Sequence, residues 1–181
     1  DLTPTGRQPM TCSNDRYTLV FNGEAYNYME LRVELLKKGV EFSSQSDSEV
    51  LLYAWITWKE ECLHRITGMF SFVVFDQVDE VVFCARDGFG IKPIYFLLDQ
   101  ENFYFASEIK SLQMILPRKQ ELKFQRAYDF LVYDNYDDSE STFFHSICQL
   151  MPGHLLEISF TSEKMKVSKR RWWIPKVEEI N

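Results

Sequence analysis

The apolar positions in the first part of the chain follow two different periods. Residues 17–21 are aromatic or β-branched almost without interruption, which predicts a strand. From Tyr28 the apolar residues recur at helical spacing until Gly39, where a helix is expected to stop. A second helical stripe begins after Ser46 and continues to Cys62. The chain is therefore expected to open with one strand and two helices.

After these helices the pattern changes to short apolar runs separated by polar turns, typical of antiparallel meanders. Strands are expected over 69–75, 81–85, 94–98, 103–106, 154–160 and 164–173, and helices near 108–114 and 125–132. The first of these strands is nearly all apolar, so both of its faces should be covered. Helices that open the chain and antiparallel strands that follow indicate an α+β domain.

Composition and net charge argue against several classes of function for this chain. The 181 residues are 45% hydrophobic and 15% aromatic, enough for one domain with a packed core. The net charge of −7, from 20 basic and 27 acidic residues, argues against a nucleic-acid partner. No run of 18 apolar residues and no signal peptide occurs, so no membrane association is expected. The four cysteines lack metal-ligand spacing and suggest free thiols in a cytoplasmic protein.

Candidate chemistry begins with Asn22-Gly23-Glu24. An Asn-Gly pair alone predicts a tight turn between strands, but the following residues have helical spacing. The motif is therefore expected on a strand-to-helix connection, where backbone N–H groups can serve a ligand. Asn27 and Glu30 have the spacing of a capping box for that helix.

The second candidate is Asp47, in the segment Ser46-Asp47-Ser48-Glu49. Ser46 and Glu49 also form a capping-box pattern, which places Asp47 in the first turn of a helix. Position alone leaves two interpretations open. The carboxylate either interacts only with the helix dipole, worth about 0.3–1 kcal/mol, or binds a ligand.

Several further motifs occur in a fixed order along the chain. They are residues 8–10, 17–28, 46–50, 68–72, 85–93, 105–110 and 150–154. As an ordered set they resemble the glutamine amidotransferase domain of glutamine-hydrolysing asparagine synthases. The Phe-Gly-Ile-Lys-Pro segment at 89–93 favours that family over sugar-phosphate and phosphoribosyl amidotransferases.

This resemblance implies an N-terminal-nucleophile hydrolase fold, a four-layer α/β/β/α sandwich of two antiparallel sheets. Residues 1–162 would form the amidotransferase domain, incomplete at its N-terminus. Residues 163–181 would be the final strand and a linker toward a synthetase domain that the sequence lacks. Arg86, Asp87 and the glycines after them would shape a turn, and Lys92 would have a structural or domain-contact role.

The resemblance also implies roles for the candidate residues. Asn22 would offer its side-chain amide, and Gly23 its backbone N–H, to the oxyanion formed during attack on glutamine. Gly23 suits this because the absence of a Cβ lets the backbone approach a substrate closely. Glu24 would contact the glutamine, and Asp47 would pair with its α-ammonium group. On this basis ligand binding is preferred for Asp47.

The sequence departs from the family pattern in three ways. It lacks the N-terminal cysteine nucleophile, the arginine segment that holds the substrate carboxylate, and the synthetase domain's pyrophosphate loop. Cys12 cannot replace the nucleophile because it is internal and has no free α-amine. The chain alone is therefore expected to be inactive and poorly soluble.

The complete protein is expected to release ammonia from glutamine for the ATP-dependent amidation of aspartate. No cofactor is expected in this domain, and ATP and Mg only in the synthetase domain. Expected partners are glutamine, the synthetase domain of the same chain and, in a homodimer, a second copy. The alternative is a non-catalytic glutamine-binding module or a decayed amidotransferase. A methionine followed directly by cysteine upstream of Asp1 in the gene would favour the enzyme.

Overall fold

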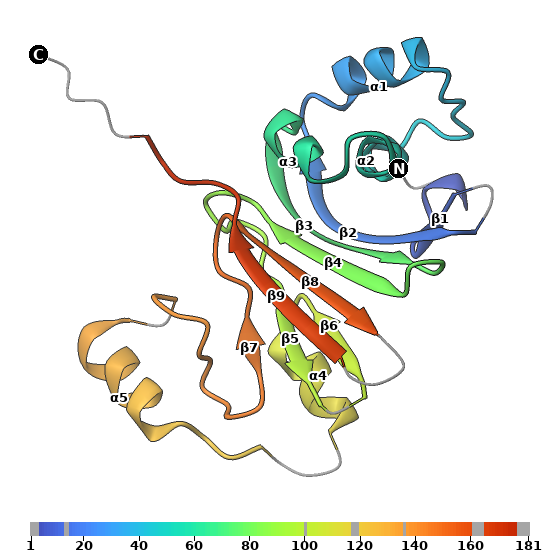
Figure 1. The fold of residues 1–181 in the computed structure, drawn as a ribbon. Coiled ribbons are helices and arrows are strands. Elements are labelled where there is room, and N and C mark those ends of the chain that lie inside the picture. Colours follow the sequence, from blue (N-terminus) through green and yellow to red (C-terminus); the bar gives the residue numbers. More distant parts are fainter. Residues whose placement is uncertain are drawn as a thin grey trace, which may run out of the picture.

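The computed structural model describes residues 4–12, 15–99, 101–116, 120–135, 137–160 and 165–176, and their elements form two antiparallel sheets flanked by helices (Figure 1). The strands are β1 (Met10–Thr11), β2 (Tyr17–Ala25), β3 (Gly68–Asp76), β4 (Val81–Arg86), β5 (Tyr95–Leu98), β6 (Phe103–Ala106), β7 (Cys148–Gln149), β8 (His154–Phe160) and β9 (Met165–Arg171). The helices are α1 (Tyr28–Lys37), α2 (Asp47–Trp58), α3 (Cys62–Arg65), α4 (Ile109–Ile115) and α5 (Phe124–Tyr133), with 3-10 turns at Pro4–Gly6 and Lys59–Glu61.

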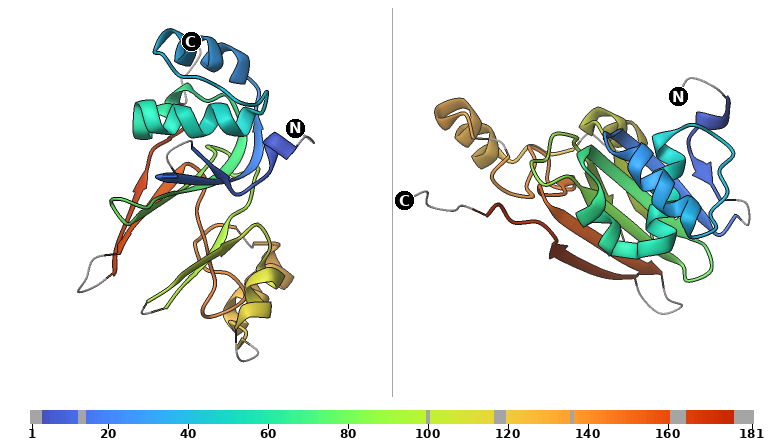
Figure 2. Two further views of the ribbon diagram at one scale, coloured as in Figure 1. Left: turned by 90° about the vertical axis from the view of Figure 1, so that its right-hand side faces the viewer. Right: turned by 90° about the horizontal axis from the view of Figure 1, so that it is seen from above.

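The larger sheet has the strand order β1-β2-β3-β4-β8-β9, and the smaller sheet has the order β6-β5-β7. All of the pairings are antiparallel, as the short polar connections predict. Figure 2 shows the layers: α1 and α2 cover one face of the larger sheet, and the smaller sheet lies on its other side with α4 beyond it. The predicted α/β/β/α sandwich is confirmed.

Two apolar cores hold these layers together. The first joins α1 and α2 to the larger sheet and includes Trp55, whose ring meets Phe72 edge to face at 5.7 Å. The second lies between the sheets and includes Val73 and Phe96. Phe72 and Val73 are neighbours on β3, so the prediction that this strand is covered on both faces is confirmed.

Some boundaries differ from the sequence expectation. The second helix was expected to continue to Cys62, but α2 ends at Trp58 because Lys59 adopts a positive φ of 51°. Cys62 then begins the separate short helix α3. The segment after residue 162 contains β9, which pairs with β8 along its whole length. The domain boundary at 162 itself stays a prediction.

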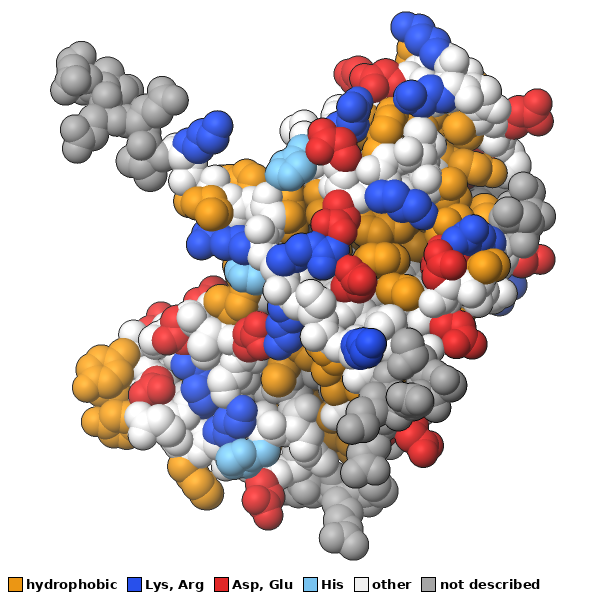
Figure 3. Space-filling view, in the orientation of Figure 1, with side chains coloured by type: hydrophobic (Ala, Val, Ile, Leu, Met, Phe, Trp, Pro, Cys, Tyr) orange, Lys and Arg blue, Asp and Glu red, His pale blue; other side chains and the backbone are white. Residues whose placement is uncertain are grey.

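Helix α5 presents an apolar stripe to solvent. Phe124 and Leu131 are 82% and 80% exposed, and Tyr128 lies between them at helical spacing. Hydrophobic side chains are visible on the surface at the place of α5 (Figure 3). The opposite side is anchored by Arg126, whose Nη1 donates to Asp138 at 2.6 Å. Exposed apolar stripes favour association. The low solubility expected of the isolated chain stays a prediction.

Arg16 and Asp76 connect the start of β2 to the end of β3. The Arg16 guanidinium donates twice to the Asp76 carboxylate, from Nε at 2.8 Å and from Nη2 at 2.9 Å. The backbone N–H groups of Val78 and Asp79 donate to the same carboxylate. Burial alone would raise the pKa of Asp76, but these hydrogen bonds to its charged form prevail and lower the pKa to about 2.

This lowered pKa predicts a loss of stability in acid. Because the folded pKa lies below the unfolded value of about 3.9, the Asp76 contribution is present above that pH. It is lost as the pH falls from about 4 toward 2. Unfolding free energies measured across this range should fall less steeply for Asp76→Asn than for the wild type. Asp79→Asn, at an exposed partner of Arg16, is the control, and equal slopes for Asp76→Asn and the wild type would contradict the assignment.

Candidate functional site

Asn22, Gly23 and Glu24 lie within strand β2, which corrects the expectation of a strand-to-helix connection. The strand continues to Ala25 because β3 pairs with it to the end, with Gly23 opposite Phe70. An added Cβ on Gly23 would lie 2.2 Å from the carbonyl oxygen of Met69. The pairing of β2 with β3 therefore requires glycine at position 23. From the sequence, this glycine was expected to allow the close approach of a substrate, whereas in the structure it allows the close approach of β3.

The backbone N–H of Gly23 points away from β3. The carbonyl of Phe70 accepts from the backbone N–H of Asp87 at 2.8 Å, and the N–H of Phe70 donates to the Asp87 carboxylate at 3.2 Å. Both polar groups of Phe70 are thus directed toward β4. Its partner Gly23 then belongs to a non-hydrogen-bonded pair, so its own N–H and C=O face the opposite edge of β2.

That edge carries a row of N–H donors at every second residue. The N–H of Phe21 donates to Gln8 Oε1 at 2.6 Å, and the N–H of Ala25 donates to Asp47 Oδ2 at 3.2 Å. Gly23 lies between these two donors and points the same way. Strand β1 pairs with β2 only at Thr18 and Leu19, so it does not cover this position. The Gly23 N–H therefore faces the outer edge of β2, between the donors of Phe21 and Ala25.

Asp47 reaches the same edge from the start of α2. It is the first helical residue, as predicted, and its half-buried carboxylate accepts from β2. A pocket of about 690 Å³ lies between the strand edge and the helix start. It is lined by Gly23, Glu24, Ala25, Tyr26, Tyr28, Gln45, Ser46 and Asp47. Three of the four candidate site residues therefore share one pocket.

Asn22 does not line that pocket. Its side chain projects to the face of β2 opposite that of Gly23, toward the smaller sheet, and its Nδ2 donates to Ser107 Oγ at 3.1 Å. Asn22 and Ser107 belong to the lining of a smaller cavity of about 160 Å³. Sequence reasoning gave Ser107 no role, although the residue belongs to the recognised motif at 105–110.

The capping boxes are only partly as predicted. Asn27 does not cap α1, because its side chain donates to the carbonyl of Arg65 and accepts from the N–H of Thr67. Ser46 does cap α2 by accepting from the N–H of Ser48 at 3.2 Å. Glu49 does not complete that box. Its buried carboxylate instead accepts four hydrogen bonds from the N–H and hydroxyl groups of the two residues at 43 and 44, which holds the turn that leads into α2.

Arg86 and Asp87 shape the turn at 86–93, as predicted. The buried Arg86 guanidinium donates to the carbonyls of Gly90 and Leu150, each at 2.7 Å. The Asp87 carboxylate accepts from several backbone N–H groups in the turn, including that of Ile91 at 3.0 Å. A Cβ on Gly88 would lie 2.6 Å from the ring of Trp173, so this glycine makes room for the tryptophan.

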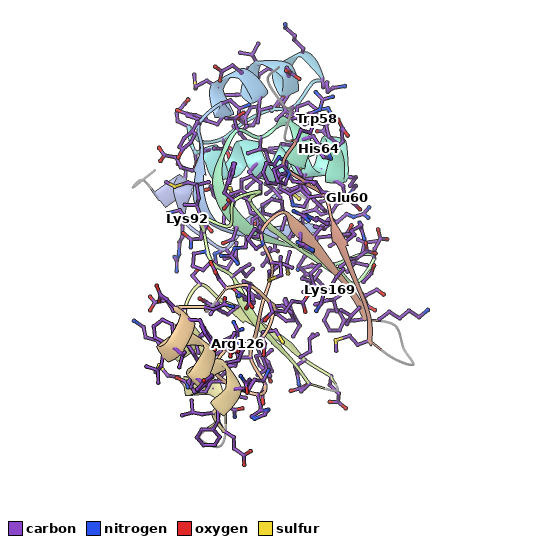
Figure 4. All side chains as sticks on the ribbon, turned by 90° about the vertical axis from the view of Figure 1, so that its left-hand side faces the viewer. Trp58, Glu60, His64, Lys92, Arg126 and Lys169 are labelled. Carbon is purple, nitrogen blue, oxygen red and sulfur yellow. The ribbon has the colours of Figure 1, made fainter. Side chains whose placement is uncertain are left out.

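No described group of three or more histidine, cysteine or acidic residues could hold a metal ion. His64 lies exposed on α3 beside Trp58 and Glu60, well separated from Lys92 (Figure 4). Its ring meets Trp172 edge to face at 5.6 Å, which gives it a packing role. No helix in the described part of the chain is long and apolar enough to cross a membrane.

The cysteines are not arranged as nucleophiles. Cys62 and Cys84 are free thiols, as predicted; both are also buried, and burial raises the pKa of both thiols. Burial also raises the pKa of Cys148. Cys12 is buried beside the first turn of the larger sheet. A thiol must ionise and be accessible to attack a substrate, so none of these four side chains fits that role.

Two antiparallel sheets between helical layers, with an uncovered strand edge opposite a helix-start carboxylate, define an amidotransferase-type α/β/β/α fold. The chain belongs to the glutamine amidotransferase domain family, whose model matches residues 1–173. It is 47% identical over 109 residues to asparagine synthetase [glutamine-hydrolyzing] 1 of Bacillus subtilis (strain 168), covering 60% of this chain and 17% of that protein. It is 31% identical over 172 residues to a probable asparagine synthetase [glutamine-hydrolyzing] of Schizosaccharomyces pombe, covering 93% of this chain and 26% of that protein.

Solved structures show the same fold. The glutamine phosphoribosylpyrophosphate amidotransferase of B. subtilis superposes with a TM-score of 0.63 at 20% identity, over 97% of this chain and 34% of that one. A regulatory enzyme of purine biosynthesis gives 0.61 at 20% identity, over 94% of this chain and 32% of that one. The chain spans between a sixth and about a quarter of the length of the two synthetase relatives described above.

Proposed function

We propose that this chain is the glutaminase portion of a glutamine-dependent asparagine synthase. The observation that carries the proposal is the shared pocket of Gly23 and Asp47, where a ligand-facing N–H donor lies opposite a carboxylate. Family membership and relatives named as glutamine-hydrolysing asparagine synthetases support it.

The spacing of the site suits glutamine. Alternate N–H groups along a strand are about 7 Å apart, so the Gly23 donor lies about that far from the Ala25 N–H that Asp47 accepts. The amino nitrogen and side-chain carbonyl oxygen of extended glutamine are roughly 6 Å apart, five bonds of about 1.5 Å joined at tetrahedral angles. One end binds the Asp47 carboxylate through the α-ammonium, and the other places its carbonyl oxygen at the Gly23 N–H.

The reaction is a nucleophilic displacement of ammonia. A thiolate attacks the side-chain amide carbon. We place the resulting oxyanion at the rim of the pocket beside β2, where the Gly23 N–H at the strand edge and the Asn22 amide on the adjoining face of the strand both donate to it. The carbon–nitrogen bond then breaks, the nitrogen leaves as ammonia after gaining a proton, and water hydrolyses the thioester to glutamate. Glu24 contacts the substrate beside these donors. The thiolate is an N-terminal cysteine of the full-length protein, since the cysteines of this chain are buried or internal.

The ammonia then amidates aspartate in a synthetase portion of the same protein. That portion uses ATP and Mg, whereas the glutaminase portion needs no cofactor of its own. We place the protein in the cytoplasm, as a homodimer of the full-length chain. The names and greater length of the relatives support the linked synthetase portion.

The direct test is glutamine turnover by the full-length protein. Glutamate and ammonia should form from glutamine alone, and asparagine should form when aspartate, ATP and Mg are added. Binding of glutamine without ammonia release would replace the enzyme with a non-catalytic glutamine-binding module.

Asp47→Asn is expected to weaken glutamine use selectively. The amide can still accept from the Ala25 N–H, but it loses the charge that pairs with the α-ammonium. Hydrogen bonds to charged groups contribute about 1.5–3 kcal/mol, so the KM for glutamine should rise roughly 10- to 150-fold. Asparagine synthesis from added ammonia should be unchanged.

The matched control is Glu30→Gln, which removes an exposed carboxylate from the first turn of α1. It should leave both activities at the wild-type level. Equal loss of glutamine-dependent and ammonia-dependent synthesis in Asp47→Asn would make Asp47 a structural residue only.

A further inference from the structure

The side-chain amide of Asn22 is connected to the smaller sheet by one hydrogen bond. Asn22 lies on β2, and Ser107 directly follows β6, 85 positions later in the sequence. The amide nitrogen Nδ2 donates to the Ser107 hydroxyl oxygen at 3.1 Å. The contact therefore spans the two layers of the sandwich at the proposed oxyanion donor.

The backbone of Ser107 is held on both sides. Ala106 before it pairs with Tyr95 of β5, and α4 begins at Ile109 after it. Its hydroxyl oxygen is thus presented from a paired strand end and a helix start. A group held this way can fix the orientation of a side chain that it contacts.

Asn22 needs such an orientation if it is an oxyanion donor. The two ends of an asparagine amide have opposite hydrogen-bonding character, and rotation about the terminal torsion is broad and roughly two-fold. Only the Nδ2 end can donate to an oxyanion, whereas the carbonyl end would repel it. By accepting one N–H of Nδ2, Ser107 leaves the second N–H of the same nitrogen for the substrate.

We propose that Ser107 is a positioning residue for glutamine hydrolysis, which orients the Asn22 amide through the hydrogen bond between the two sheets. The proposal rests on the glutaminase function proposed above. Ser107 acts through Asn22 and does not itself touch the substrate. The orientation matters most in the transition state, because only there does the carbonyl oxygen carry a full negative charge.

The test uses the full-length protein and the variant Ser107→Ala. Its kcat for ammonia release from glutamine should fall about tenfold, with the KM for glutamine unchanged. This is expected because the hydrogen bond that the change weakens, from Asn22 to the oxyanion, is made only in the transition state. Asparagine synthesis from added ammonia should stay at the wild-type rate, which shows that the protein is folded. Ser107→Thr keeps the hydroxyl and should restore most of the glutamine kcat.

The control Ser111→Ala removes an exposed serine hydroxyl from α4, four positions further on, and should change neither activity. A double-mutant cycle then separates positioning from a general effect on the fold. In the Asn22→Ala background, Ser107→Ala should cause no further loss of kcat, because the group that it orients is gone.

Four results would overturn the proposal. A wild-type kcat in Ser107→Ala, or a further tenfold loss in the Asn22→Ala background, rejects the role of Ser107 but leaves the glutaminase function standing. Parallel loss of glutamine-dependent and ammonia-dependent synthesis also rejects it, in favour of a structural role. Absence of ammonia release by the wild-type full-length protein would overturn the proposed function together with this inference.

Discussion

Gly23→Ala is expected to prevent stable pairing of β2 with β3. The added methyl carbon would lie 2.2 Å from the carbonyl oxygen of Met69 and 2.7 Å from Cα of Phe70. Both are backbone atoms in the middle of the larger sheet, so no side chain can rotate to relieve the overlap. Overpacking costs 1–3 kcal/mol where side chains can adjust, and here we expect a loss of more than about 3 kcal/mol.

The measurement is the free energy of unfolding in denaturant, with Gly39→Ala as the matched control. Gly39 also has a positive φ, of 86°, but a Cβ there would meet nothing within 4 Å. Its replacement should cost only about 1 kcal/mol, the backbone penalty alone. If both variants lost the same stability, the close approach of β3 to Gly23 would be contradicted.

Asn22→Ala is expected to have the largest effect on catalysis. Removal of one oxyanion donor lowers kcat by about 10²–10³ in enzymes that form tetrahedral intermediates. The glutamine KM should change little, because the oxyanion exists only in the transition state. Steady-state rates of ammonia release by the full-length protein measure both parameters.

Asn27→Ala is a suitable control for this variant because it removes the same side chain five positions later. Its amide joins the carbonyl of Arg65 to the N–H of Thr67, so the change should lower stability and leave the glutamine kcat nearly unaltered. A normal kcat in Asn22→Ala would remove Asn22 from the oxyanion hole.

The local spacing of apolar residues was sufficient to predict much of this fold. The strands and helices expected from apolar spacing are present, and the predicted two-sided burial of β3 follows from its apolar sequence. The error at Asn22-Gly23 has a tertiary cause. An Asn-Gly pair favours a turn, yet here β3 keeps the chain extended to Ala25. That pairing depends on a distant strand, which local propensity does not contain.

The sequence indicated residues that the structure brings together, but it did not indicate their geometry. The resemblance indicated Gly23, Glu24 and Asp47, and they share one pocket. The direction of the Gly23 N–H depends on how Phe70 pairs with Asp87, two strands away. The role proposed for Ser107 depends on a contact between sheets, across 85 positions of sequence. Neither the direction of the Gly23 N–H nor the contact with Ser107 can be predicted from the residues next to Asn22 in the sequence.

The most direct test of the central claim is a crystal structure of the full-length protein with glutamine bound, its nucleophile replaced to prevent turnover. We expect the α-ammonium of glutamine within hydrogen-bonding distance of the Asp47 carboxylate, and the side-chain carbonyl oxygen directed at the Gly23 N–H. Glutamine bound elsewhere, or bound with its α-ammonium away from Asp47, would contradict it.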